Sequence, residues 1–244
     1  MKRLFFLILI SCLLACSKND SAPTTSGSTA GSGGSLARFA LSSDHLYTVS
    51  PSHLTAYNVA TAENPVEQKE INLGFGVETI FPYKNNLFIG TETGMKIMDI
   101  TNPHTPVFLS SYEHIRSCDP VVANDEYAFV TLRSGTTCRQ GINALNIIDI
   151  KNLSTPKLVQ TYTLNKPYGL AIDGTNLFVC DGGIRHYDAT DAKNLSLKST
   201  TPIEATDVIA NNGVLMVIGK DGIYQYDYSG GSLVFLSKIA TSEK

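Results

Sequence analysis

One segment of this chain recurs five times along its length. The ten residues from Phe39 to Thr48 align without gaps with segments that begin at residues 80, 121, 170 and 208. The starting points are 41, 41, 49 and 38 residues apart. One column of this alignment is apolar in every unit: Leu46, Leu87, Ala128, Leu177 and Leu215. A period near 40 residues predicts a repeat architecture, in which each unit needs its neighbours to bury its apolar surface.

The second unit shows what each repeat contains. Apolar runs begin at Ile80, Leu87, Met95 and Val107, and turns rich in Asn, Gly or Pro separate them. Such runs are typical of strands, and no part of the chain after residue 16 keeps a 3.6-residue apolar period. Four antiparallel strands in about 40 residues are typical of a β-propeller blade. The sequence therefore predicts an all-β fold, a five-bladed β-propeller of four-stranded antiparallel blades.

The repeat also sets the expected domain boundaries. We expect one propeller domain over residues 36–244, with units at about 36–76, 77–117, 118–166, 167–204 and 205–244. Each unit contains all four of its own strands. We therefore expect the ring to close by packing of the fifth blade against the first, although strand exchange at the ends stays open.

Two of the third strands resemble the consensus of the LVIVD-repeat family. The matching segments are Met95–Pro103 (MKIMDITNP) and Leu145–Leu153 (LNIIDIKNL). The resemblance extends in weaker form over residues 36–239. It implies a bacterial protein, secreted or lipid-anchored, that forms a propeller. The family brings no established activity to the chain.

The N-terminus has the pattern of an export signal. Lys2 and Arg3 precede the apolar run Leu4–Leu14, which is too short to span a bilayer. Its end, Leu13-Leu14-Ala15-Cys16, resembles a bacterial lipobox. That resemblance implies a signal peptide over residues 1–15, acylation of Cys16 and anchoring of the mature protein to the outer membrane, on either leaflet. An ordinary secretory signal that happens to contain a cysteine is the alternative.

Composition restricts the partners. Residues 16–35 are rich in Ser, Gly and Thr, which predicts a flexible tether. The whole chain carries a net charge of −3, and loss of Lys2 and Arg3 makes it more negative. A nucleic-acid-binding protein would need a concentrated basic face, so we expect no nucleic-acid partner. No motif indicates a cofactor or a metal site. Apart from the membrane, the expected partner is a protein or a glycan.

Three cysteines remain after the signal peptide and Cys16. The third unit is about eight residues longer than the second, and its extra loop at 133–141 contains Cys138. Cys118 lies in the connection that enters the same unit, and both connections leave a propeller on one face. We therefore predict a Cys118–Cys138 disulfide. A metal site of these cysteines with His114 is the alternative, although it lacks a closely spaced ligand pair. Cys180 lies within an apolar strand and is predicted to be a buried thiol.

Polar residues that break the repeat gather on that same face. They are the candidate binding face of the sequence, where arginines would grip carboxylate or sulfate groups. The face comprises Glu78, His114, Arg116, Asp119, Arg133, Arg139, Tyr168 and Asp207. A merely solvated polar rim is the alternative interpretation.

Residues that fill the same column in every unit are interpreted as structural. Each third strand ends in an aspartate or asparagine: Asn58, Asp99, Asp149, Asp188 and Asp227. We expect each side chain to accept a backbone N–H in the turn that follows.

No catalytic residue set is evident, so the first hypothesis is a non-catalytic binding or assembly module. The second is a hydrolase or lyase that holds Ca²⁺ at the channel mouth through Glu78, Asp119 and Asp207. Arg38 in the same ring of residues opposes a cation there.

Overall fold

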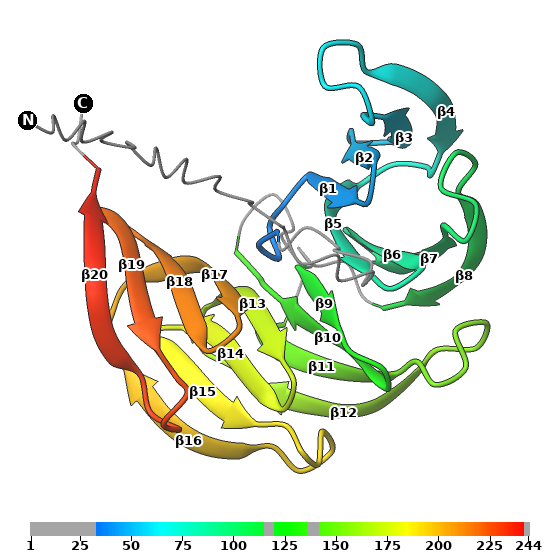
Figure 1. Ribbon diagram of the computed structural model, residues 1–244. Coiled ribbons are helices and arrows are strands. Elements are labelled where there is room, and N and C mark those ends of the chain that lie inside the picture. Colours follow the sequence, from blue (N-terminus) through cyan, green and yellow to red (C-terminus); the bar gives the residue numbers. More distant parts are fainter. Residues whose placement is uncertain (1–32, 115–119, 136–141, 242–244) are drawn as a thin grey trace, which may run out of the picture.

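The computed structural model describes residues 33–114, 120–135 and 142–241. Within these ranges the chain forms twenty strands in five four-stranded antiparallel sheets, and no helix. The sheets stand as blades around a common centre, with the first strand of each blade innermost (Figure 1). No helix in the described part of the chain could cross a membrane. The predicted five-bladed propeller is confirmed.

Each blade is made of four consecutive strands. Blade 1 comprises β1 (Phe39–Ser42), β2 (His45–Val49), β3 (His53–Asn58) and β4 (Val66–Asn72). Blade 2 comprises β5 (Val77–Tyr83), β6 (Asn86–Thr91), β7 (Gly94–Asp99) and β8 (Val107–Glu113). Blade 3 comprises β9 (Val121–Ala123), β10 (Tyr127–Leu132), β11 (Ala144–Asp149) and β12 (Lys157–Thr163). Blade 4 comprises β13 (Pro167–Asp173), β14 (Asn176–Asp181), β15 (Ile184–Asp188) and β16 (Ser196–Thr201). Blade 5 comprises β17 (Ala205–Asn211), β18 (Val214–Gly219), β19 (Gly222–Asp227) and β20 (Val234–Ala240).

The repeated polar column forms the predicted turns. The side-chain Oδ1 of each member accepts the backbone N–H of the residue two positions later, at 2.7 Å for Asp99 and Thr101 and at 2.9 Å for Asn58 and Ala60. The bonds made by Asp149, Asp188 and Asp227 follow the same pattern. The side-chain bond from Thr101, and then its backbone N–H bond, hold the pKa of the Asp99 carboxyl below its usual range. The structural interpretation of this column is confirmed.

A glycine opens the third strand where two backbones come close together. Gly94 has φ 152°, and a Cβ there would lie 2.0 Å from the carbonyl oxygen of Tyr112 on the neighbouring strand. Gly222 occupies the same place in blade 5, where an added Cβ would lie 2.4 Å from the carbonyl oxygen of Ile239. Only a residue without a side chain lets the fourth strand pair this closely.

Four hydrophobic clusters hold the five blades together, and each cluster joins one pair of neighbours. Successive side chains of an inner second strand pack against different neighbouring blades. Leu87 packs with blade 1, whereas the next residue, Phe88, packs with blade 3. Because successive side chains of a strand point to opposite faces, a strand inside the array is apolar on both. Phe129 and Phe178 repeat the contact of Phe88 with the following blade.

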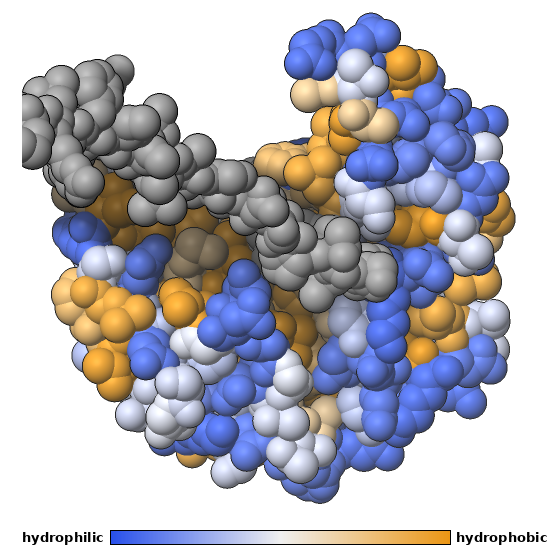
Figure 2. Space-filling model, in the orientation of Figure 1, coloured by the Kyte–Doolittle hydropathy of each residue, from blue (hydrophilic) through white to orange (hydrophobic). Residues whose placement is uncertain are grey.

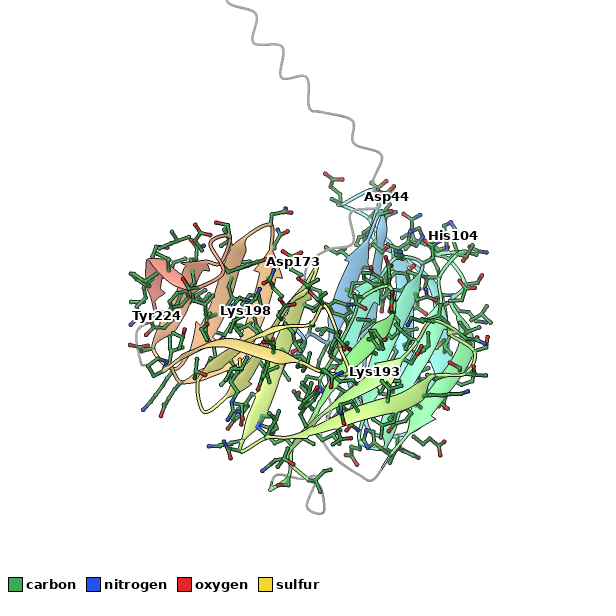
Figure 3. The ribbon with its side chains drawn as sticks, turned by 90° about the horizontal axis from the view of Figure 1, so that it is seen from below. Asp44, His104, Asp173, Lys193, Lys198 and Tyr224 are labelled. Atoms are coloured by element: carbon green, nitrogen blue, oxygen red, sulfur yellow. The ribbon has the colours of Figure 1, made fainter. Side chains whose placement is uncertain are left out.

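Polar contacts supplement these apolar interfaces. The Nε2 atom of His45 in blade 1 lies 3.2 Å from Nδ1 of His104 in blade 2. Tyr162 of blade 3 donates to the carbonyl of Lys193 at 2.8 Å, and Tyr228 of blade 5 donates to Asp173 of blade 4. His104, Asp173 and Lys193 lie on the connections and strand ends in Figure 3. Blades 1 and 2, blades 3 and 4, and blades 4 and 5 are thus joined by both apolar packing and polar contacts.

The ring stays open between its two terminal blades. No hydrophobic cluster of the described residues joins blade 5 to blade 1. Along β2 only alternate residues are buried, and along β18 the opposite alternation occurs, so each terminal blade has one covered face. Figure 1 shows blades 1 and 5 standing apart, and the space-filling view in Figure 2 is hollowed between them. The expectation that blade 5 packs directly against blade 1 is wrong, because a cavity of about 500 Å³ separates Phe39 and Leu41 of blade 1 from Ile209 and Ile218 of blade 5.

A strap before the first strand bridges the centre of the ring instead. Ser35 is buried, and its Oγ donates to Oδ1 of Asp207 in β17 at 2.9 Å. The Oγ of Ser35 also accepts the N–H of Leu170 in β13, at 2.8 Å. Two residues later, the Ala37 carbonyl accepts the N–H of Ile80 in β5 at 2.9 Å. Residues 33–37 therefore connect blades 4 and 5 with blade 2 through hydrogen bonds.

Candidate binding face

Antiparallel blades place two kinds of connection at one end of the propeller. These are the hairpins between second and third strands and the links from one blade to the next. Arg133 directly follows β10, and Tyr168 lies near the start of β13 in the next blade. The buried hydroxyl of Thr131 donates to the Tyr168 carbonyl at 2.7 Å. Arg133 lies two residues after Thr131, on the same side of the strand, and is therefore directed toward Tyr168.

Two cations flank the Tyr168 ring. The guanidinium carbon of Arg133 lies 4.5 Å from the ring centroid, and Nζ of Lys166 lies 5.7 Å from it. Both distances are within the range of cation–π attraction. The cluster of Arg133, Lys166 and Tyr168 therefore combines an aromatic surface with two positive charges, and we call it the binding face cluster.

A buried carboxylate fixes the connection that carries Lys166 and Tyr168 of this cluster. The side chain of Asp181 accepts the N–H groups of Asn165 at 2.9 Å and of Lys166 at 2.6 Å. It also lies 2.9 Å from the guanidinium of Arg185. Charge-assisted bonds of this kind hold a loop in one conformation. Lys166 and Tyr168 therefore project from a rigid support.

A cavity of about 400 Å³ adjoins the cluster between blades 4 and 5. Two lysines and one glutamate supply the charges around it. It is lined by Lys166, Tyr168, Gly182, Gly183, Glu204, Ala205, Thr206 and Lys220. Its volume is that of a site for a small ligand or for a few side chains of a partner.

Several residues of the predicted face lie outside the described residues. They are Arg116, Asp119 and Arg139, together with Cys118 and Cys138 of the predicted disulfide; Cys16 also lies outside. The disulfide and the lipidation therefore stay predictions. His114 lies directly after β8, and its N–H donates to the Thr93 carbonyl at 3.0 Å.

Glu78 and Asp207 lie on the inner strands β5 and β17, and Asp207 lies against Gly169, the residue after Tyr168. Glu78 lies half-buried in β5. Asp207 is 5% exposed, and its carboxylate accepts bonds from Ser35 and Leu36 of the strap. Burial raises the pKa of the Asp207 carboxyl. The structure thus gives Asp207 a role in holding the strap.

The acidic residues of the described chain do not converge on a metal-binding geometry. No group of three or more His, Cys, Asp or Glu side chains in the described ranges could hold a metal ion. Arg38 was predicted to oppose a cation at the channel mouth. Its guanidinium donates to the Val77 carbonyl at 3.3 Å. Cys180 is a buried free thiol, as expected, and burial raises its pKa.

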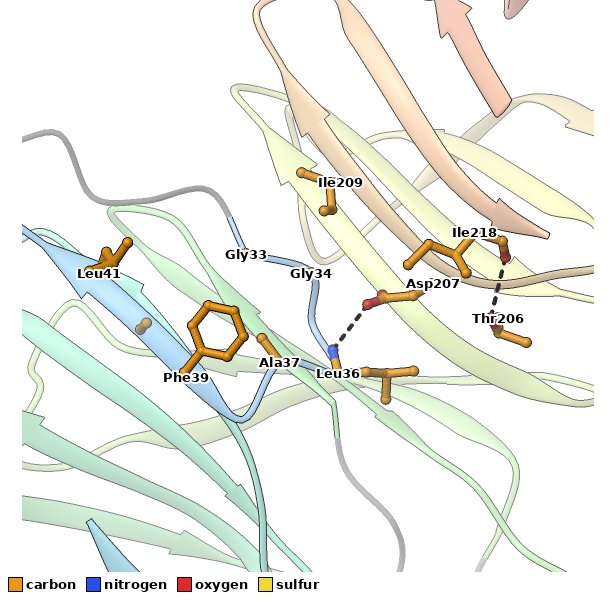
Figure 4. Close-up of a pocket in the computed structure, with 11 residues that line it drawn as sticks. Gly33, Gly34, Leu36, Ala37, Phe39, Leu41, Thr206, Asp207, Ile209 and Ile218 are labelled. Atoms are coloured by element: carbon orange, nitrogen blue, oxygen red, sulfur yellow. Dashed lines mark hydrogen bonds between the residues drawn. The ribbon is translucent and has the colours of Figure 1, made fainter. Parts of the chain in front are cut away.

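A second cavity, of about 500 Å³, lies where the ring is open, and sequence reasoning missed it (Figure 4). Phe39 and Leu41 of blade 1 line one side, and Ile209 and Ile218 of blade 5 line the other. The strap passes along its floor, where Leu36 N–H donates to Asp207 at 3.3 Å. The apolar residues at exposed positions of both end units, such as Phe39, Leu41 and Ile218, were a possible signal for it.

Comparison with known proteins identifies the repeats. The LVIVD repeat model matches residues 82–114 and 140–164, which contain third and fourth strands of blades 2 and 3. The chain contains LVIVD repeats. The resemblance of Met95–Pro103 and Leu145–Leu153 to this family is thereby confirmed. No curated protein matches this LVIVD-repeat chain.

Solved structures with the same fold are distant in sequence. A protein of unknown function from Desulfotomaculum acetoxidans DSM 771 is 12% identical, with TM-score 0.66, over 84% of this chain and 69% of its own. BamB from Moraxella catarrhalis is 16% identical, with TM-score 0.56, over 84% and 62%. A chain of the mitotic checkpoint complex is 17% identical, with TM-score 0.57, over 78% and 61%. At these identities the similarity shows the propeller fold alone, and the LVIVD-repeat chain spans about two thirds of these propellers.

Proposed function

We propose that this LVIVD-repeat propeller is a non-catalytic binding or assembly module that recognises an acidic protein or glycan partner. The observation that carries the proposal is the binding face cluster, in which Arg133 and Lys166 lie near the ring of Tyr168, and Asp181 fixes the connection that holds Lys166 and Tyr168. A preorganised aromatic ring with two cations binds carboxylate or sulfate groups without a further cost of ordering the loop. The matched chain of this fold from the mitotic checkpoint complex belongs, by the name of that structure, to a complex, which supports a protein partner.

A double substitution of the two cations tests this proposal. We expect Arg133→Ala with Lys166→Ala to weaken partner binding about five- to thirtyfold, since each exposed cation–π or ion-pair contact contributes about 0.5–1 kcal/mol. The measurement is quantitative mass spectrometry of proteins cross-linked to the chain in its native envelope. The folding of the variant is checked by circular dichroism.

A matched control comes from the opposite end of the blades. Lys84 lies 5.6 Å from the Tyr83 ring and Lys151 lies 4.9 Å from the Tyr127 ring, so Lys84→Ala with Lys151→Ala also removes two cations next to tyrosines. This control is expected to keep all partners. Retention of every partner by the Arg133/Lys166 variant, or equal losses in both variants, would contradict the proposed face.

We further propose that the mature protein is anchored to the outer membrane through acylated Cys16. The proposal is supported by the lipobox-like sequence Leu13–Cys16 and by the polar tether that follows. A mature chain with two or three acyl chains would bind a bilayer stably.

Replacement of Cys16 by Ser is expected to abolish incorporation of labelled fatty acid and to move the protein from the membrane fraction to the soluble fraction. The matched control is Cys12→Ser, within the apolar segment, which should leave both properties unchanged. A Cys16→Ser protein that still carries the label would exclude Cys16 as the lipid site.

A further inference from the structure

Phe75 is the most exposed large apolar residue in the described part of the chain. It is 95% exposed, whereas the next such residue, Val107, is 62% exposed. Phe75 lies on the connection that leads from β4 of blade 1 to β5 of blade 2. A phenylalanine that stays in water gains none of the free energy that burial of its ring would provide. The stability of the propeller therefore does not explain Phe75.

The residues on either side of Phe75 are glycines with a left-handed backbone. Gly74 has φ 82° and Gly76 has φ 80°. Residues with a side chain rarely adopt such angles, so the two glycines allow two sharp bends in succession. Phe75 lies between these bends, and its side chain extends into solvent.

Hydrogen bonds fix this connection before and after Phe75. The N–H of Leu73 donates to the Ser52 carbonyl at 2.8 Å. The carbonyl of Gly76 accepts the N–H of Glu92, also at 2.8 Å. A residue on a fixed connection loses little conformational freedom when a partner covers it. The backbone of Phe75 is therefore preorganised for binding.

Phe75 occupies in one connection the place that Lys166 of the binding face cluster occupies in another. A buried leucine directly follows β4 and β12, and these residues are Leu73 and Leu164. The N–H of each leucine donates to a carbonyl of the hairpin between the second and third strands of its blade, at 2.8 and 2.9 Å. Phe75 and Lys166 both come two residues after the leucine, and both are exposed. Equivalent connections thus present an aromatic ring and a cation.

These two connections lie at the same end of the propeller. Each leads into an inner strand, β5 or β13, and the inner strands all start at one end because every blade has the same strand order. β9 lies between β5 and β13 and beside both (Figure 1). Since packed sheets lie about 10 Å apart, two such steps place Phe75 about 20 Å from the binding face cluster. A standard interface covers about 800 Å² of each partner, a patch roughly 30 Å across, so one partner can contact both.

We propose that Phe75 is the apolar anchor of the recognition surface that also contains the binding face cluster. This inference rests on the proposed function and names the partner as a protein. That protein has an apolar pocket for the Phe75 ring and, about 20 Å away, carboxylates for Arg133 and Lys166. Protein interfaces commonly obtain most of their affinity from a few such aromatic and cationic residues.

The surroundings of Phe75 favour a protein over a glycan or a lipid surface. A phenylalanine ring has no group that could form hydrogen bonds with sugar hydroxyls. The side chain of Glu92 lies against Gly76, where an added Cβ would be 3.1 Å away. A carboxylate beside the ring opposes insertion into an anionic membrane surface. An apolar pocket on a protein can cover a projecting ring on all sides.

Photo-cross-linking of the full chain in its native envelope tests the anchor. The photoreactive residue p-benzoylphenylalanine in place of Phe75 should become joined to a protein that Arg133→Ala with Lys166→Ala no longer binds. With that protein purified, Phe75→Ala should weaken binding about 10- to 100-fold, the effect of losing a fully buried phenylalanine side chain. The matched control, Phe108→Ala, removes a ring that is 53% exposed on the outer strand β8 and should bind as the parent does.

The outcomes separate this inference from the proposed function. If Phe75→Ala retains a partner that Arg133→Ala with Lys166→Ala loses, the binding face stands and the anchor is overturned. If only Phe75→Ala loses the partner, the cluster has no role in binding and the shared surface is overturned. Photoproducts at position 75 with phospholipid alone, or with no protein, overturn the anchor. A lower urea midpoint for Phe75→Ala than for the parent also overturns it, because the ring would then pack against its own chain.

Discussion

Ser35→Ala is expected to lower the free energy of unfolding by about 2–4 kcal/mol, although it removes a single oxygen atom. That oxygen donates to Asp207 at 2.9 Å and accepts from the N–H of Leu170 at 2.8 Å, inside the molecule. Its loss leaves the buried N–H of Leu170 without this acceptor, at a cost of about 1–3 kcal/mol. It also removes one bond, worth about 1 kcal/mol, from Oδ1 of Asp207, which keeps the Val208 N–H at 3.0 Å. Neighbouring backbone relaxation and water entry offset only part of this cost. The strap is therefore a main source of stability at the centre of the open ring.

Urea unfolding followed by far-ultraviolet circular dichroism and tyrosine fluorescence measures this effect, because the chain has no tryptophan. Ser111→Ala on the exposed part of β8 is the control and should change the free energy of unfolding by less than about 0.5 kcal/mol. If Ser35→Ala were no more destabilising than Ser111→Ala, the strap would not contribute to stability as inferred.

The blades could be predicted from the sequence because their determinants are local. Asp99 and Asn58 each bond the N–H two residues later, so a single column of the alignment specifies the turn. The strands follow the same logic. Leu87 and Phe88 are adjacent apolar residues that face different neighbours, which is how a strand between two sheets is recognised.

The opening of the ring could not be predicted in this way. Repeat alignment shows which columns meet between neighbouring blades, but the rotation from one blade to the next depends on the combined shapes of many side chains. Met216 in place of phenylalanine gives only a weak sign that blade 5 has no successor. The strap is hidden for a different reason. Ser35 and Asp207 lie 172 residues apart, and Ser35 belongs to a stretch whose composition indicates a tether.

The candidate binding face was predictable only in part. Arg133 and Tyr168 were assigned to one end of the propeller by topology, and they lie in contact there. Lys166 was missed because a lysine on a connecting loop carries no signal of its own. Its position follows from the bond between its N–H and Asp181, a contact between a loop and the end of β14 that the sequence does not specify.

A loss of stability in mild acid is expected from His186, on β15. Its ring is fully buried and stacks on Phe178 with centroids 4.5 Å apart, while Nε2 lies 2.8 Å from Oδ1 of Asn176. Burial, and then the nearby Lys198, lowers the pKa of His186 to about 4, against 6.5 for an ordinary histidine. The folded state therefore favours the neutral ring. The resulting stability is complete above pH 6.5 and is lost as the pH falls toward 4, by roughly 2–3 kcal/mol.

His186→Phe separates this effect from the titration of carboxylates. Phenylalanine keeps the stacking on Phe178, and Lys198 still donates to the Asn176 oxygen at 3.3 Å. The free energy of unfolding, measured in urea at pH 7 and pH 4, should fall by about 2–3 kcal/mol less in His186→Phe than in the wild type. Parallel pH curves for His186→Phe and the wild type would mean that the buried ring is not the group that titrates, because every other ionisable group is common to both proteins.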